Sequence, residues 1–153
     1  MFQIKLTDEQ KAKAEAVEAK RKSVETARDE AATNAYAKAF DDVGCDASKL
    51  IVHELPEGFG GGVIHRLPSK EEWTILSRRS IRDFASKVKD DDHFRAVAHV
   101  IENPKLLIYP PLNELQALCN ELPGLYAKIH DTIENRCNNG NYLGKGTVFS
   151  SEP

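Results

Sequence analysis

The feature that most constrains this fold is a long stretch near the N-terminus without a glycine or a proline. Residues 8–41 are rich in alanine, glutamate, lysine and arginine, and they follow the capping-box sequence Thr-Asp-Glu-Gln at residues 7–10. This composition predicts one helix of roughly 50 Å, at 1.5 Å per residue. Gly44 is suited to end that helix, because glycine readily adopts the left-handed conformation found just after many helices.

The apolar stripe along this helix is thin. Val17 and Val24 stand seven residues apart, and the stripe continues mostly through alanines, with two aromatic residues near its end. So few large apolar side chains cannot bury the helix deeply. Two interpretations therefore remain open: the first half of the helix is solvated, or its alanines let a second helix approach closely, as in a coiled coil. The residues that would form an oligomer or partner face are Val17, Val24, Ala27, Ala31, Tyr36 and Phe40.

The rest of the chain alternates short β-branched runs with short helical patterns. Residues 49–55 and 63–67 predict an antiparallel hairpin with a flexible, glycine-rich loop between its strands. About four short helices follow, and residues 105–109 form either a strand or a buried linker. We therefore expect an α+β fold that is predominantly helical. The expected units are a long N-terminal helix over residues 1–44, a hairpin plus helical domain over residues 45–140 and a flexible tail over residues 141–153.

Composition and charge argue against several classes of protein. A net charge of −3 and an aromatic content of 7% do not favour a nucleic-acid-binding surface. No run of 18 apolar residues predicts a membrane span. The N-terminus becomes charged before the apolar core of a signal peptide could form, and an odd number of cysteines, 3, fits free thiols in a reducing compartment. These features predict a cytoplasmic protein.

No motif predicts a catalytic, metal or cofactor site. The run from Asp90 to His93 resembles a set of metal ligands, but consecutive side chains in an extended segment point to alternate sides, and acidic residues are typical of a helix start. The glycines at residues 60–62 lack the Lys-Ser/Thr and the following helix of a phosphate-binding loop. These two features alone motivate a small enzyme or ligand-binding protein, which is the last-ranked hypothesis.

Three short motifs stand in a recognisable order. The first is Arg-Leu-Pro-Ser-Lys-Glu-Glu-Trp after the second predicted strand, the second is Tyr-Pro after an apolar segment, and the third is Pro-Gly between two helices. Together with an opening Leu-Thr-Asp-Glu-Gln, this order resembles the small tail assembly chaperones of tailed bacteriophages, over residues 6–10 and 49–140. Residues 11–46 depart from the family, whose members reach the hairpin sooner. The motif residues are Arg66, Pro68, Ser69, Glu72, Trp73, Tyr109, Pro110, Pro123 and Gly124.

The resemblance implies a non-enzymatic protein without a cofactor, working in the cytoplasm of the bacterial host. Its partner would be the long, helical tape measure protein, which it would keep soluble until the tail tube polymerises around it. An unassembled tape measure protein exposes apolar helical stripes that aggregate, and a helical protein with apolar grooves can cover them reversibly. The chaperone itself is expected to be a homo-oligomer.

We expect the Arg-Leu-Pro-Ser-Lys-Glu-Glu-Trp motif to be architectural. Pro68 would fix the direction in which the chain leaves the strand, Glu72 would cap the next helix, and Trp73 would fill the core. The alternative function is a virion structural or scaffold component that oligomerises through its N-terminal helix.

Overall fold

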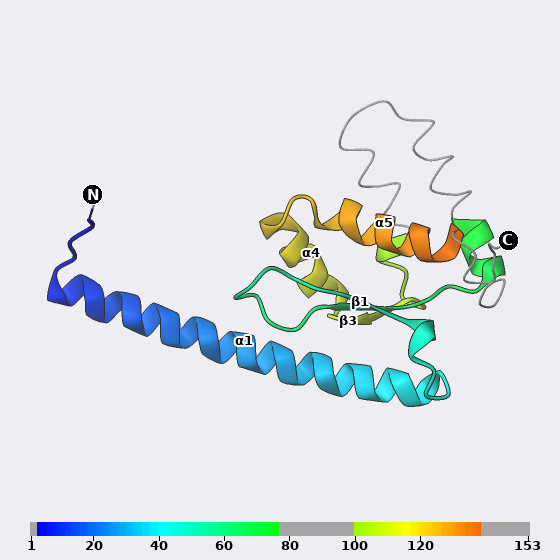
Figure 1. The fold of residues 1–153 in the computed structure, drawn as a ribbon, viewed down its shortest axis with the longest axis horizontal. Helices are drawn as coiled ribbons and strands as arrows, with labels where there is room; N and C mark the ends of the chain where they lie inside the picture. The colour runs from blue at the N-terminus through cyan, green and yellow to red at the C-terminus, as the bar shows by residue number, and fades with distance from the viewer. Residues whose placement is uncertain (1–2, 77–99, 139–153) are drawn as a thin grey trace, which may run out of the picture.

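The computed structural model describes residues 3–76 and 100–138, and they form a mixed α+β fold that is mostly helical (Figure 1), as the sequence predicts. The predicted helices between residues 77 and 99, the run from Asp90 to His93 and the predicted tail lie outside the described residues. The described elements are α1 (Asp8–Asp42), a short 3-10 turn η1 (Ala47–Lys49), β1 (Leu50–His53), β2 (Val63–Arg66), β3 (Leu107–Tyr109), α4 (Leu112–Glu121) and α5 (Leu125–Asn138).

The two ends of α1 follow from local sequence. Thr7 and Gln10 form the predicted capping box: the Thr7 hydroxyl accepts from the Gln10 N–H at 3.1 Å, and the Gln10 side chain accepts from the Thr7 N–H at 2.9 Å. At the other end, Val43 is the last capping residue and Gly44 follows with φ of 72°. Both predictions are confirmed, and α1 runs for 35 residues without a break.

Three short strands form an antiparallel sheet in the order β1-β2-β3. The predicted hairpin is confirmed, with Leu50 opposite Arg66 and His53 opposite Val63. Residues 107–109 form a third strand against β2, with a register irregularity at Ile64 and His65. Of the two interpretations of the short apolar segment, the structure shows the strand.

Both faces of the sheet are covered, because alternate residues of a strand point to opposite sides. Ile51 and Val63 belong to the main core, which lies on the side of α4 and α5. Leu50 and Ile64, although 4% and 2% exposed, lie outside that core cluster and point to the side of α1. The sheet therefore lies between α1 on one side and the layer of shorter helices on the other (Figure 1).

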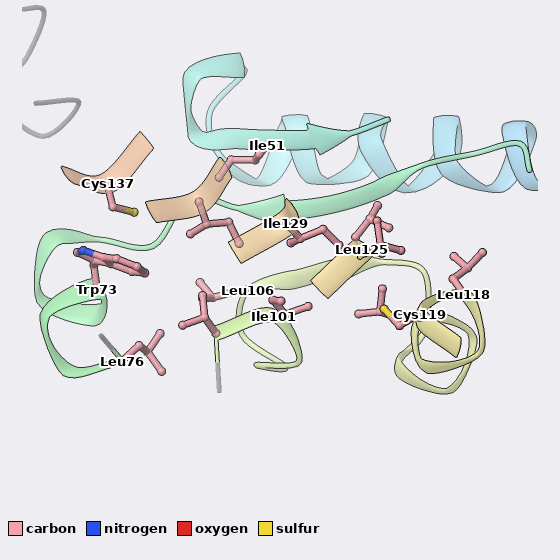
Figure 2. Packing of buried hydrophobic residues seen from close by; sticks show 14 residues of the cluster. Ile51, Trp73, Leu76, Ile101, Leu106, Leu118, Cys119, Leu125, Ile129 and Cys137 are labelled. Atoms are coloured by element: carbon pink, nitrogen blue, oxygen red, sulfur yellow. The ribbon is translucent and has the colours of Figure 1, made fainter. Parts of the chain in front are cut away.

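The main core gathers apolar side chains from the sheet, from the two C-terminal helices and from a helix that begins at Lys70 (Figure 2). Trp73, predicted as a core residue, is 7% exposed, and so is Cys119. Fully buried members of this core are Val63, Val100, Ile101, Leu106, Leu115, Ile129 and Ile133.

The N-terminal half of α1 extends beyond the rest of the molecule (Figure 1). Residues 8–24 are all exposed, and Ala39 is the one buried residue of the helix. The C-terminal half packs against β2 and β3. Within this chain the first half of α1 is therefore solvated, whereas the approach of a second helix from another molecule stays a prediction, as does the division of the chain into units.

Candidate partner-binding surface

The loop between β1 and β2 is held against the middle of α1 by three polar contacts. The Arg21 guanidinium donates to the Gly58 carbonyl oxygen and the Arg28 guanidinium to the Phe59 carbonyl oxygen, each at 3.2 Å. From the other direction, the Gly61 N–H donates to the Asp29 carboxylate at 2.6 Å. These contacts connect the loop to α1, whereas the predicted flexibility of the loop stays a prediction.

The glycines of the loop serve close approach as well as turning. Gly60 and Gly61 adopt φ of 74° and 70°, a conformation that glycine tolerates best. A Cβ atom on Gly60 would lie 2.5 Å from the Glu25 carbonyl oxygen, and one on Gly61 would lie 3.1 Å from the Arg28 carbonyl oxygen. The glycines at positions 60 and 61 therefore let the backbone of the loop lie directly on the backbone of α1.

The docked loop creates an open groove of about 440 Å³ between α1, the loop and the end of α4. Its apolar lining comes from Val17, Val24 and Phe59, and Phe59 also packs against the main core. Val17 and Val24 are 69% and 44% exposed, which is high for valine on a helix that already packs on a sheet. The charged side chains that line the same groove are Lys20, Arg21, Arg28, Glu57 and Glu121.

A second groove, of about 390 Å³, lies along the C-terminal half of α1, where Arg66, Lys105 and Ile108 face the helix. Six of the α1 residues that line the two grooves are spaced three or four residues apart within each groove and eleven residues apart between the grooves, which places these six on one face of the helix. We call this the groove face. It spans roughly 40 Å at 1.5 Å per residue. Its members are Val17, Lys20, Val24, Ala35, Lys38 and Asp42.

The structure separates the six residues predicted as an oligomer or partner face. Val17 and Val24 lie on the groove face, and Ala27 and Ala31 are exposed but line neither groove. Tyr36 and Phe40 are half-buried and stack on each other with ring centroids 6.0 Å apart. These six residues therefore do not share one surface, because the five-residue step from Ala31 to Tyr36 carries the two aromatic residues to another face of the helix.

The Arg-Leu-Pro-Ser-Lys-Glu-Glu-Trp motif joins β2 to the helix that begins at Lys70. Arg66 donates two hydrogen bonds to the Glu72 carboxylate, at 3.0 and 2.8 Å, and the same carboxylate accepts from the Ser69 N–H at 2.8 Å. The Ser69 hydroxyl accepts in turn from the Glu72 N–H at 3.1 Å, which completes the predicted capping box. The Arg66 guanidinium and the Ser69 N–H hold the pKa of the Glu72 carboxyl down to about 2.

Other motif residues also sit where they shape the backbone. Pro68 is buried, and Trp73 donates from its indole N–H to the Asn138 side chain at 2.8 Å, which ties the motif to the last turn of α5. Tyr109 is half-buried and joined to Pro110 by a cis peptide bond just before α4. Pro123 and Gly124 are exposed between α4 and α5.

Sequence reasoning missed a buried pair of histidines, His53 on β1 and His65 on β2. The His65 Nε2–H donates to the Ile101 carbonyl oxygen at 2.8 Å, so its Nδ1 is free to accept. The His53 Nε2–H then donates to that Nδ1 at 3.1 Å. Burial is the main cause that lowers the pKa of His53 to about 3 and that of His65 to about 4. Both rings are therefore neutral at pH 7.

Comparison of the chain with protein-family models, with curated proteins and with solved structures gives no match. Within residues 3–76 and 100–138, no helix is both long enough and apolar enough to cross a membrane.

Proposed function

We propose that this chain is a non-enzymatic assembly chaperone of a tailed bacteriophage. It binds the helical tape measure protein in the cytoplasm of the bacterial host and keeps it soluble while the tail assembles. The order of the three sequence motifs supports this class of protein. The observation that carries the proposal is the groove face of α1, a single helical face with a groove near each of its ends.

The groove face suits a partner helix that lies alongside α1. Amphipathic helices bind in grooves through apolar side chains spaced three and four residues apart, which is also the spacing of the groove face. Exposed Val17 and Val24, together with Phe59, supply the apolar contact. Basic side chains outnumber acidic ones around both grooves, which favours a partner helix whose apolar stripe is flanked by acidic residues.

The proposal is tested by co-expressing the full chain with a helical fragment of the tape measure protein. We expect the wild-type chain to raise the soluble fraction of the fragment, and the double variant Val17→Lys/Val24→Lys to lose that effect, because two charges enter the apolar floor. The matched control is Ala12→Lys/Ala19→Lys, which has the same spacing on exposed positions of α1 that line neither groove. No gain in soluble fragment with the wild-type chain would overturn the proposal.

The alternative function, a virion structural or scaffold component, is favoured by one observation: residues 8–24 of α1 are exposed along their whole length. Sedimentation of the full chain distinguishes the two. A stable oligomer that dissociates in the valine variant, with no effect of the chain on the tape measure fragment, favours self-assembly through α1. Deletion of α1 would not test this cleanly, since its C-terminal half packs against β2 and β3 of the sheet.

A further inference from the structure

Three potential metal ligands lie together on α5, away from the groove face. His130, Asp131 and Glu134 each offer one ligand atom, and these atoms all lie within 4.8 Å of one another. His130 and Glu134 are four residues apart, so their side chains are neighbours on the helix surface, and Asp131 reaches the same site from three residues before Glu134. The His130 Nδ1 and an Asp131 carboxylate oxygen are 3.9 Å apart.

The His130 ring is held in place from the core side. Its side chain is 15% exposed, and its ring centroid lies 6.3 Å from that of Trp73. Trp73 is in turn fixed by its hydrogen bond to Asn138 on α5. A ligand whose orientation is set by packing binds a metal ion with a smaller loss of side-chain freedom.

The two carboxylates carry like charge three residues apart, and Lys128 stands three residues before Asp131 as a helical neighbour of opposite charge. Among residues 3–76 and 100–138, no lysine or arginine forms an ion pair with Asp131 or Glu134. Like charges three residues apart on a helix repel each other, and Glu134 lies close to the last turn of α5, where the helix dipole disfavours a negative charge. A bound cation would reduce both the repulsion between the carboxylates and the unfavourable interaction of Glu134 with the helix dipole.

We propose that His130, Asp131 and Glu134 bind one divalent transition-metal ion, with water in the remaining coordination positions. One imidazole nitrogen and two carboxylate oxygens suit Zn²⁺, Co²⁺ and Mn²⁺ better than Mg²⁺ or Ca²⁺, which prefer oxygen ligands alone. The site is independent of the proposed chaperone function, since none of its ligands lines either groove. The sequence alone does not indicate the site, because a helical i, i+1, i+4 pattern of His, Asp and Glu is common on solvated helices.

The chain carries its own reporter for this site, since it contains a single tryptophan. Titration of the untagged full-length protein with Co²⁺, which is paramagnetic, should quench Trp73 fluorescence saturably with one equivalent bound. Zn²⁺, which does not quench, should then compete and restore the emission. His130→Gln should abolish the quenching, and Asp131→Asn and Glu134→Gln should each weaken Co²⁺ binding by about 10-fold or more, since each removes a direct ligand.

The matched control is Glu114→Gln on α4, an exposed carboxylate outside the cluster, which should leave the titration unchanged. Asp131 is the decisive position if the histidine variant does not fold, because its side chain is 73% exposed and its substitution leaves the core intact. The proposal is overturned if Co²⁺ gives no saturable quenching up to about 1 mM, or if Asp131→Asn and Glu134→Gln bind Co²⁺ as the wild type does.

Discussion

We expect the buried histidine pair to make the stability of this protein fall in mild acid. His53 and His65 are 5% and 0% exposed. Protonation of either ring would place a buried imidazolium charge beside the other ring. Lys128 and Arg136 on α5 add further positive charge near His53, which disfavours its protonation again. The folded state therefore resists protons that the unfolded chain accepts freely.

The magnitude follows from proton linkage. The unfolded histidines titrate near 6.5, whereas the pKa values of His53 and His65 in the folded state are lowered to about 3 and about 4. At pH 5 the unfolded chain has therefore bound nearly two protons that the folded chain has not. Between pH 7 and pH 5 the free energy of unfolding should fall by about 2 kcal/mol for each histidine, or about 4 kcal/mol for the pair. The loss continues down to the folded-state pKa values.

The assay is urea unfolding between pH 7 and pH 5 of the wild type and of His53→Gln. The glutamine amide can still donate to the His65 Nδ1, but it does not titrate, so the variant should lose only about half as much stability over this range. The comparison between the two proteins isolates His53 from the carboxylates, which contribute equally to both. Parallel pH profiles for the two proteins would refute the reasoning.

Three further predictions concern the motif and the loop. Arg66→Met should lower the free energy of unfolding by about 1–2 kcal/mol in urea at pH 7, because it removes two charge-assisted hydrogen bonds from the Glu72 carboxylate; a change below about 0.3 kcal/mol would count against this role. Glu72→Gln should flatten the loss of stability as the pH falls from 4.5 towards 2, the window set by its lowered pKa, and an unaltered acid profile would contradict it. Gly60→Ala should cost about 1–3 kcal/mol, since its φ is positive and its Cβ would meet the backbone of α1, whereas Gly124→Ala, with nothing within 4 Å, should change stability by less than about 0.5 kcal/mol.

The long helix and the hairpin could be predicted because their signals are local. A stretch without glycine or proline, a capping box at Thr7 and a glycine at position 44 specify α1 without reference to the rest of the chain. β-branched runs on both sides of a glycine-rich loop specify the hairpin in the same way. The strand at residues 107–109 stayed ambiguous because three residues are too few for a periodicity.

The contacts that shape the candidate surface are not local, and the sequence does not show them. The glycines at positions 58, 60 and 61 could indicate either a free loop or a close approach, and the contacts of the loop with Arg21, Arg28 and Asp29, about 30 to 40 residues away in sequence, show the close approach. The Arg66–Glu72 pair joins the end of a strand to the start of a helix. Neither the two-residue period of a strand nor the 3.6-residue period of a helix therefore predicts this contact. The histidine pair would have followed from the hairpin register, which sets His53 diagonally across from His65, but the loop length left that register open.

The grip of the β1–β2 loop on α1 has a mechanical consequence. The loop contacts the helix at residues 21–29, about midway along its length. A force on the exposed N-terminal half of α1 would therefore act on the hairpin through these contacts. A load applied to that end would be delivered to β1 and β2 and to the histidines between them, well before it reached the turn at Gly44. A partner that binds the N-terminal end of α1 would therefore be mechanically coupled to the sheet.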